Sequence, residues 1–260
     1  MAKTPRIKLV TPRGTLRYPK LNQINYGTEK YPVKDGNFET EIILDKTDPE
    51  FAVLEGKLAP LYAQAKELAD KAWADLPVAA RKELQGKGVK GPILRPLVKD
   101  MYDDKTEELL STARMKLKMP AGGIRKNGPK AGTAWFMRPA AIDAKGTPLP
   151  LFLDNGQPHP KARRIYNGTL ARLGFEIDTN KDGGIGYFVA GDATYGIRAT
   201  MQVVRILKYG SAQGVNAAAY GFEDEEGYDL DGDDYDASSD AEASTQSEAP
   251  ATDGQVSGNF

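Results

Sequence analysis

The strongest constraint on the fold is an alternation of apolar and basic residues near the middle of the chain. Successive side chains of a β-strand point to opposite faces, so a repeat of two marks a strand with two unlike faces. The segment "ARMKLKM" therefore predicts a half-buried strand with one apolar face and one positive face. Its two alternating sets are Ala113, Met115, Leu117, Met119 and Arg114, Lys116, Lys118.

The same period recurs in other segments, which we interpret as further strands. They are "RIKLV", "NFETEIIL" with Phe38, Thr40, Ile42 and Leu44 on one face, "RRIYNGTLARLGFEI" with Tyr166 near its start, and "YGIRATMQVVRILKY". In the last of these, Ile197, Ala199, Met201 and Val203 are expected to face inward, and the slip at Val203-Val204 predicts a bulge. Residues 13–33, which are basic, aromatic and rich in turn formers, are expected to form a long loop.

A long amphipathic helix is predicted between these strands. Asp48 is a good N-cap, Pro49 suits the first helical position, and apolar residues then recur at helical spacing as far as Trp73. Gly56 and Pro60 predict a kink or a break in its early part. A short second helix follows in "PVAARKELQGKGVKG", so the helical insertion covers about residues 48–90.

At least five strands, one long inserted helix and long loops favour a mainly β fold. We expect an OB-fold, a five-stranded Greek-key barrel of the oligonucleotide-binding type, with a mixed α+β sheet as the alternative. About 220 ordered residues suffice for one core, so residues 1–222 are assigned to a single domain.

The C-terminal segment 223–260 differs from this domain in charge. It holds thirteen of the 36 Asp and Glu and no Lys or Arg, which leaves 23 acids against all 35 Lys and Arg in residues 1–222. The domain therefore carries about +12 although the chain totals −1. We interpret the segment as a disordered acidic tail, and the basic domain predicts a polyanionic partner.

Few residues offer catalytic or metal chemistry. The chain has no Cys, and His159 is the only His, so no thiol chemistry and no multi-histidine metal site is expected. "DTNKDGGIGYFV" matches part of a calcium loop, but Val189 stands at the twelfth position and the flanks resemble strands, which favours a hairpin turn. We expect no cofactor and no enzyme activity. Because the sequence has no long apolar segment, we expect no membrane insertion either. A metal-dependent nuclease remains an alternative.

Basic and aromatic residues are interleaved, as in proteins that bind single strands by pairing cations with phosphates and stacking bases on aromatic rings. The sequence predicts sequence-nonspecific binding of single-stranded DNA; the alternative is a charged module that binds duplex DNA or protein without stacking. The candidate DNA-binding residues are Arg13, Arg17, Tyr18, Lys20, Tyr26, Tyr31, Lys116, Lys118, Trp135, Arg138, Tyr166 and Arg198.

The order of these elements resembles the bacteriophage single-stranded DNA-binding proteins of the T7 type. The resemblance lies in "YPVKDGNFETEIILDKTDPEF", in "YNGTLARLGFEI" with "GGIGYFVAGDATYGIRATMQVVRILKYG", and in the acidic tail that ends at Phe260. It implies an accessory of phage DNA replication, recombination and repair in the cytoplasm of the infected bacterium. It also implies a homodimer, since members of that family are often dimeric.

In that family the tail occupies the DNA groove when DNA is absent, and it contacts DNA polymerase and helicase-primase through its terminal aromatic residue, here Phe260. One departure concerns this tail. Its acids cluster between Glu223 and Glu242, and "GQVSGNF" is uncharged. Competition for the groove is therefore the better supported of the two implied roles.

Overall fold

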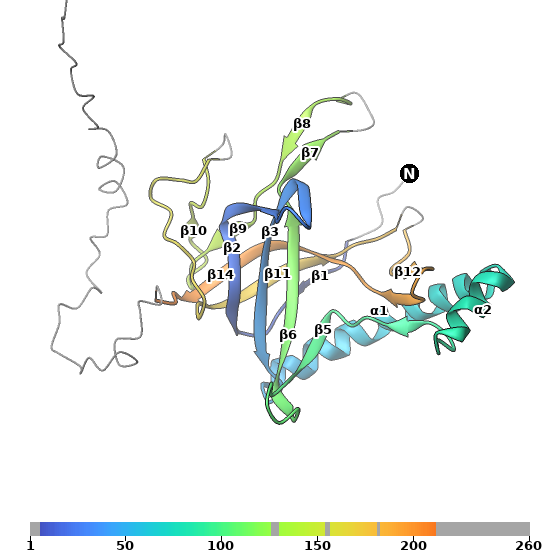
Figure 1. Ribbon diagram of the computed structural model, residues 1–260. Helices are drawn as coiled ribbons and strands as arrows, with labels where there is room; N and C mark the ends of the chain where they lie inside the picture. The colour runs from blue at the N-terminus through green and yellow to red at the C-terminus, as the bar shows by residue number, and fades with distance from the viewer. Residues whose placement is uncertain (1–5, 126–129, 154–156, 181–182, 212–260) are drawn as a thin grey trace, which may run out of the picture.

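The computed structural model describes residues 6–125, 130–153, 157–180 and 183–211, and within them it forms a closed five-stranded barrel (Figure 1). The second strand of the barrel pairs antiparallel with the first and third, the fifth pairs parallel with the third, and the fourth closes the ring by pairing with the fifth and the first. This is the pairing of an OB-fold, so the predicted fold class is confirmed. In chain order the barrel strands are β2 (Gly14–Gly27), β3 (Pro32–Asp45), β6 (Leu109–Pro120), β11 (Leu170–Ile177) and β14 (Ala199–Lys208).

Shorter strands extend the barrel. β1, β9 and β10 extend the main sheet, and β5 pairs with the first half of β6. A small separate sheet consists of β12, β13 and β4. β7 and β8 form a hairpin that stands above the barrel in Figure 1. Their bounds are β1 (Lys8–Val10), β4 (Ile93–Leu94), β5 (Val98–Tyr102), β7 (Gly122–Ile124), β8 (Ala134–Phe136), β9 (Ala140–Ile142), β10 (Pro148–Leu149), β12 (Tyr187–Val189) and β13 (Thr194–Gly196).

The barrel interior is built from the predicted alternation. All the residues that the period assigned to the apolar faces of β3 and β6 are buried, and their basic or acidic neighbours point outward. Each fully buried side chain of Leu or Met size contributes roughly 1.5–3 kcal/mol of hydrophobic stabilisation. The buried residues of these two strands are Phe38, Thr40, Ile42, Leu44, Ala113, Met115, Leu117 and Met119.

Two helices lie between β3 and β6, as predicted: α1 (Pro49–Ala74) beneath the barrel and α2 (Val78–Gly86) beyond it (Figure 1). The Asp48 carboxylate caps α1 by accepting a hydrogen bond from the backbone N–H of Glu50 at 2.9 Å. Of the kink or break predicted at Gly56 and Pro60, the break is wrong, because α1 runs through both residues without interruption. Packing of a continuous apolar face against the rest of the core outweighs the single hydrogen bond that Pro60 cannot donate.

The predicted loop at residues 13–33 is also wrong, since most of it is strand β2. Turn-forming residues are tolerated there because β2 pairs along its length with the strongly patterned β3, and register shifts absorb the irregularities. The hairpin tip between Gly27 and Pro32 is the part that remains a turn.

Two details of the later strands differ from prediction. Tyr166 lies in a turn before β11 and not in the strand. The bulge in β14 falls at Gln202, because Gly174 pairs with Val203 while Phe175 pairs with Met201. The extra residue turns Val203 away from the interior, where Val204 is fully buried in its place.

Among the described residues, neither helix is long and apolar enough to span a membrane. The predicted acidic tail, its boundary at residue 222 and Phe260 all lie outside the described residues.

Candidate nucleic-acid interface

The outer face of β6 carries a row of cations. Because its apolar residues fill the barrel, Arg114, Lys116 and Lys118 point outward, each with about half of its side chain exposed. β3 presents two carboxylates beside them: Glu41 lies opposite Lys116 and Glu39 opposite Lys118. The nearest ion-pair distances are 3.3 Å from each lysine Nζ to Glu39 Oε2 and 3.7 Å from Arg114 to Glu41.

A bulge in β2 adds two more cations to this face. Arg17 lies opposite Glu41 and Lys20 opposite Glu39, so three residues of β2 span the distance that two residues of β3 span. The extra residue is accommodated at Tyr18, whose backbone adopts the left-handed region with φ of 49°. Without the bulge, residues three apart in a strand would point to opposite faces.

Partial burial alone would raise the pKa of Glu39, since it disfavours the charged carboxylate. The charges of Lys116 and Lys118 and the hydrogen bonds that these lysines donate outweigh that effect, so the pKa of Glu39 lies below its ordinary value. Glu39 is therefore ionised at neutral pH.

A basic cleft of about 830 Å³ opens where the neighbour of β6 changes. β5 pairs with β6 as far as Met115, and β14 pairs with it at Lys118, so the ladder on this side is interrupted at Lys116 and Leu117. The interruption leaves a hollow between the two neighbouring strands. Its charged lining residues are Arg95, Lys99, Arg114, Lys116, Lys118, Arg198, Glu41 and Asp178.

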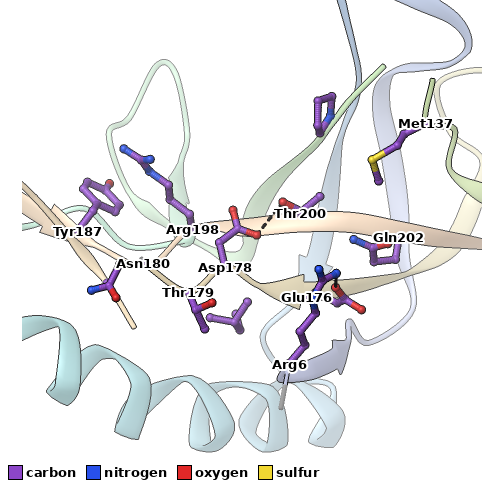
Figure 2. A pocket seen from close by; sticks show the side chains of 13 residues that line it. Arg6, Met137, Glu176, Asp178, Thr179, Asn180, Tyr187, Arg198, Thr200 and Gln202 are labelled. Atoms are coloured by element: carbon purple, nitrogen blue, oxygen red, sulfur yellow. Dashed lines mark hydrogen bonds and ion pairs between the residues drawn. The ribbon is translucent and has the colours of Figure 1, made fainter. Parts of the chain in front are cut away.

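The connection from β11 to β14 forms the far wall of the cleft. It carries Tyr187, and the guanidinium of Arg198 lies over the Tyr187 ring at 4.8 Å. A second groove of about 520 Å³ continues from this wall, and Figure 2 shows Asp178 at its centre accepting a 2.7 Å hydrogen bond from the Thr200 hydroxyl. The cleft and the groove share Tyr187 and Arg198, so they lie next to each other.

The structure brings five of the predicted site residues to this face. Lys116, Lys118 and Arg198 line the cleft, and Arg17 and Lys20 lie on the same outer face of the sheet, two strands away from β6.

Three predicted tyrosines are well exposed. Tyr18 is 60% exposed beside Arg17, whose guanidinium lies 5.0 Å from the ring centre. Tyr26 and Tyr31 flank the tip of the β2–β3 hairpin and are 60% and 70% exposed. These rings are available to a partner that extends beyond the cleft.

The other predicted residues lie apart from the cleft. Arg13 lines a different hollow, next to the cap of α1, with its Nε 3.9 Å from Asp48. Arg138 donates to the backbone carbonyls of Phe152 and Leu153 and so ties two loops together. Trp135 lies in β8 with its indole against Gly123. Tyr166 is half-buried and lines neither hollow.

Sequence reasoning missed part of the cleft. Arg95, Lys99 and Tyr187 come from segments without a clear repeat, and only the tertiary fold places them beside β6. Arg114 was not among the predicted site residues either, although it shares the alternation of Lys116 and Lys118, and this signal could have found it.

The described residues contain no group of three or more His, Cys, Asp or Glu arranged to hold a metal ion. The described part of the calcium-like segment forms a turn, in which the Asn180 side chain accepts a hydrogen bond from the backbone N–H of Gly184 at 2.8 Å. The His159 Nδ1 accepts one from the backbone N–H of Lys161. Both side chains thus have local structural roles.

No known protein-family model matches this chain, and no curated protein sequence is significantly similar to it. Among solved structures, gp2.5, a single-stranded DNA-binding protein encoded by bacteriophage T7, is 14% identical, with a TM-score of 0.49 over 86% of this chain and 98% of that one. The single-stranded DNA-binding protein from bacteriophage Enc34, solved in complex with single-stranded DNA, is 15% identical, with a TM-score of 0.41 over 82% and 91%. Both are single-stranded DNA-binding proteins of bacteriophages, the group that the resemblance in the sequence names.

Proposed function

We propose that this protein binds single-stranded DNA without sequence preference. The observation that carries the proposal is the cleft beside β6, where six basic side chains meet the Tyr187–Arg198 stack. In OB-folds, the face of the second and third strands and the loops that flank it bind oligonucleotides. Here those strands are β3 and β6. Tyr26 and Tyr31 flank the tip of the β2–β3 hairpin, and Tyr187 lies in β12, within the connection from β11 to β14.

The chemistry of this face suits an unpaired strand. Phosphates would be neutralised by the lysines and arginines of the cleft, and bases would stack on exposed rings, each stack contributing roughly 1–3 kcal/mol. A hollow of about 830 Å³ falls in the range of roughly 300–1,000 Å³ that is usual for small-ligand sites. That size suits the nucleotides of one strand better than a double helix.

We further propose that the acidic segment 223–260 competes with DNA for this face, and that the protein serves phage DNA replication, recombination and repair in the infected bacterium. The charge distribution supports competition, because the basic body and the acidic segment are on one chain. A tethered segment acts at an effective concentration that is roughly millimolar for short linkers. Contacts of Phe260 with a polymerase or helicase-primase belong to the same proposal.

The test compares affinity for an oligo-dT strand and for a duplex between about 50 and 200 mM salt. We expect tighter binding of the single strand, with a slope near −0.7 per phosphate contact in the logarithm of affinity against that of salt concentration. Replacing both Lys116 and Lys118 by Gln should make the slope shallower by roughly 1.4. A chain that stops after Phe222 keeps every described residue and should bind more tightly than the whole chain.

The matched control replaces Lys82 of α2 and Lys87, which follows the helix, by Gln. This removes the same charge from residues that line neither hollow. Affinity that does not depend on salt would contradict the proposal. Equal affinity for single strand and duplex would instead favour a charged module that binds without base stacking.

A further inference from the structure

A carboxylate lies in the middle of the basic face. Glu39 projects from the outer side of β3, between the cations of β2 and those of β6, and only 14% of its side chain is exposed. Its Oε2 lies 3.3 Å from the Nζ atoms of both Lys116 and Lys118. One oxygen thus pairs with both lysines of the cleft, so that a single negative charge is shared between two positive ones.

The other oxygen of Glu39 is held separately. Asn25 donates to Glu39 Oε1 from its Nδ2 at 3.1 Å. The orientation of the Asn25 amide is set by its Oδ1, which accepts hydrogen bonds from Lys20 Nζ at 3.0 Å and from the backbone N–H of Gly27 at 3.1 Å. The carboxylate therefore keeps a hydrogen-bond donor even when the lysines turn to another anion.

We propose that Glu39 is a resident counter-ion of the nucleic-acid site, whose carboxylate competes with a DNA phosphate for Lys116 and Lys118. This inference rests on the function proposed above. In the free protein, Glu39 holds the two ammonium groups in place. When a strand binds, phosphate oxygens take over the lysines, and Glu39 remains on Asn25 as a buried negative charge close to the phosphates. Glu39 thereby lowers the affinity of the face and limits how firmly it holds a strand.

The test replaces the carboxylate by a neutral amide of the same shape, Glu39→Gln. A unit charge at about 6 Å, at an effective dielectric constant of about 20, changes a binding constant by roughly a hundredfold at most, and salt screening at an exposed face reduces this effect. We expect Glu39→Gln to bind oligo-dT roughly three- to tenfold more tightly at low salt, with a salt slope steeper by up to about 0.7. Affinity should be measured by titration of the full-length protein.

Glu83→Gln is the matched control, because it also removes a carboxylate that pairs with a lysine. Glu83 lies in helix α2, and its partner Lys87 follows that helix. Its affinity should stay within about twofold of the parent, because Glu83 lines neither hollow and its exposed charge is screened by solvent and salt. Affinity of Glu39→Gln that is unchanged or weaker than that of the parent would overturn the proposal, since Glu39 would then only position the lysines.

A second measurement needs no variant, so it is decisive even if Glu39→Gln folds poorly. The carboxyl carbon of Glu39 is titrated by NMR with and without oligo-dT. Loss of the lysines and approach of phosphates should raise its pKa when DNA is bound, and an unchanged pKa would overturn the proposal. If the parent protein shows no salt-dependent binding of single strands, the proposed function fails and this inference fails with it. If single strands bind but the pKa of Glu39 does not respond, only this inference fails and the proposed function stands.

Discussion

Tyr18 shows how one residue changes what a strand presents. A left-handed backbone at a residue other than Gly costs roughly 1–3 kcal/mol, and such strain persists only where the surroundings hold it. Here the Asn167 side chain accepts a 2.6 Å hydrogen bond from the Tyr18 N–H, which replaces the ladder bond lost at the bulge. The result is that Arg17 and Lys20 share one face.

Tyr187 is the residue whose role in binding is most directly testable. Replacing Tyr187 by Leu keeps apolar volume but removes the ring next to Arg198. If bases stack here, the free energy of binding oligo-dT should weaken by roughly 1–3 kcal/mol, with an unchanged salt slope because no charge is lost. Fluorescence titration at two salt concentrations measures both quantities.

Tyr102→Leu is the control, since Tyr102 is an exposed tyrosine at the far end of β5 and lines neither hollow. Equal affinities of the two variants would show that Tyr187 is not a stacking platform. A thermal unfolding curve of each variant excludes a general loss of structure.

Among the elements, helix α1 supports the wall of the cleft. Its buried Ala65 leaves room for Gly186, at the start of β12, to approach its backbone. A Cβ atom built on Gly186 would lie 2.7 Å from the Ala65 Cα, and Gly186 has φ of +106°. Both the close approach and the backbone angle require glycine at this position. The helix thereby fixes the segment that carries Tyr187.

Gly186→Ala should therefore separate β12 from α1. We expect the free energy of unfolding to fall by about 2 kcal/mol or more, and affinity for single strands to fall as well, because Tyr187 is displaced. Gly56→Ala in the same helix meets no neighbouring atom within 4 Å and should raise the free energy of unfolding by about 0.5–1 kcal/mol. Urea unfolding of both variants checks these values, and equal stabilities would contradict the proposed packing.

At the scale of the whole molecule, the cleft is a consequence of how the barrel closes. β6 pairs with β3 along nearly its whole length on one side, but on the other it exchanges β5 for β14. The exposed cations of one strand therefore border an opening in the sheet. This gap in the strand pairing places the row of cations on β6 beside a hollow. Core packing is not lost, since the apolar face of β6 remains buried.

The stability of the whole molecule should depend on acid pH through its turns. Hydrogen bonds from the Thr147 backbone to Asp143, and from the Thr194 hydroxyl to Asp192, lower the pKa of these carboxyls despite an opposing effect of desolvation. A carboxyl whose pKa is lower in the folded state stabilises the fold above its unfolded pKa of about 4, and this contribution is lost as the pH falls through the folded pKa.

The free energy of unfolding should accordingly change little between about pH 8 and 5 and fall below about pH 4. Asp143→Asn should be less stable than the parent at neutral pH, and this difference should shrink as the pH falls through the folded pKa of Asp143, because the carboxyl is then protonated. Urea unfolding at several pH values measures it. A difference that persists at low pH would show that the charge of Asp143 does not matter.

The sequence alone was sufficient for the elements with an uninterrupted local repeat, β3, β6 and α1. The period of two in β3 and β6 predicted which residues fill the barrel, and the Asp48 cap with the apolar spacing after it predicted α1, because side-chain direction follows from local backbone geometry. The positive face at Lys116 and Lys118 came from the same alternation.

The tertiary structure alone decided the register of β2, the continuity of α1 through Pro60 and the course of the cleft wall. These depend on pairing between residues far apart in sequence, where packing against a neighbouring strand or helix outweighs local preference. Arg95, Arg114 and Tyr187 meet at one cleft because the barrel closes. Local sequence does not encode that closure. The sequence determined which side chains the face carries, and the fold decided where these side chains come together.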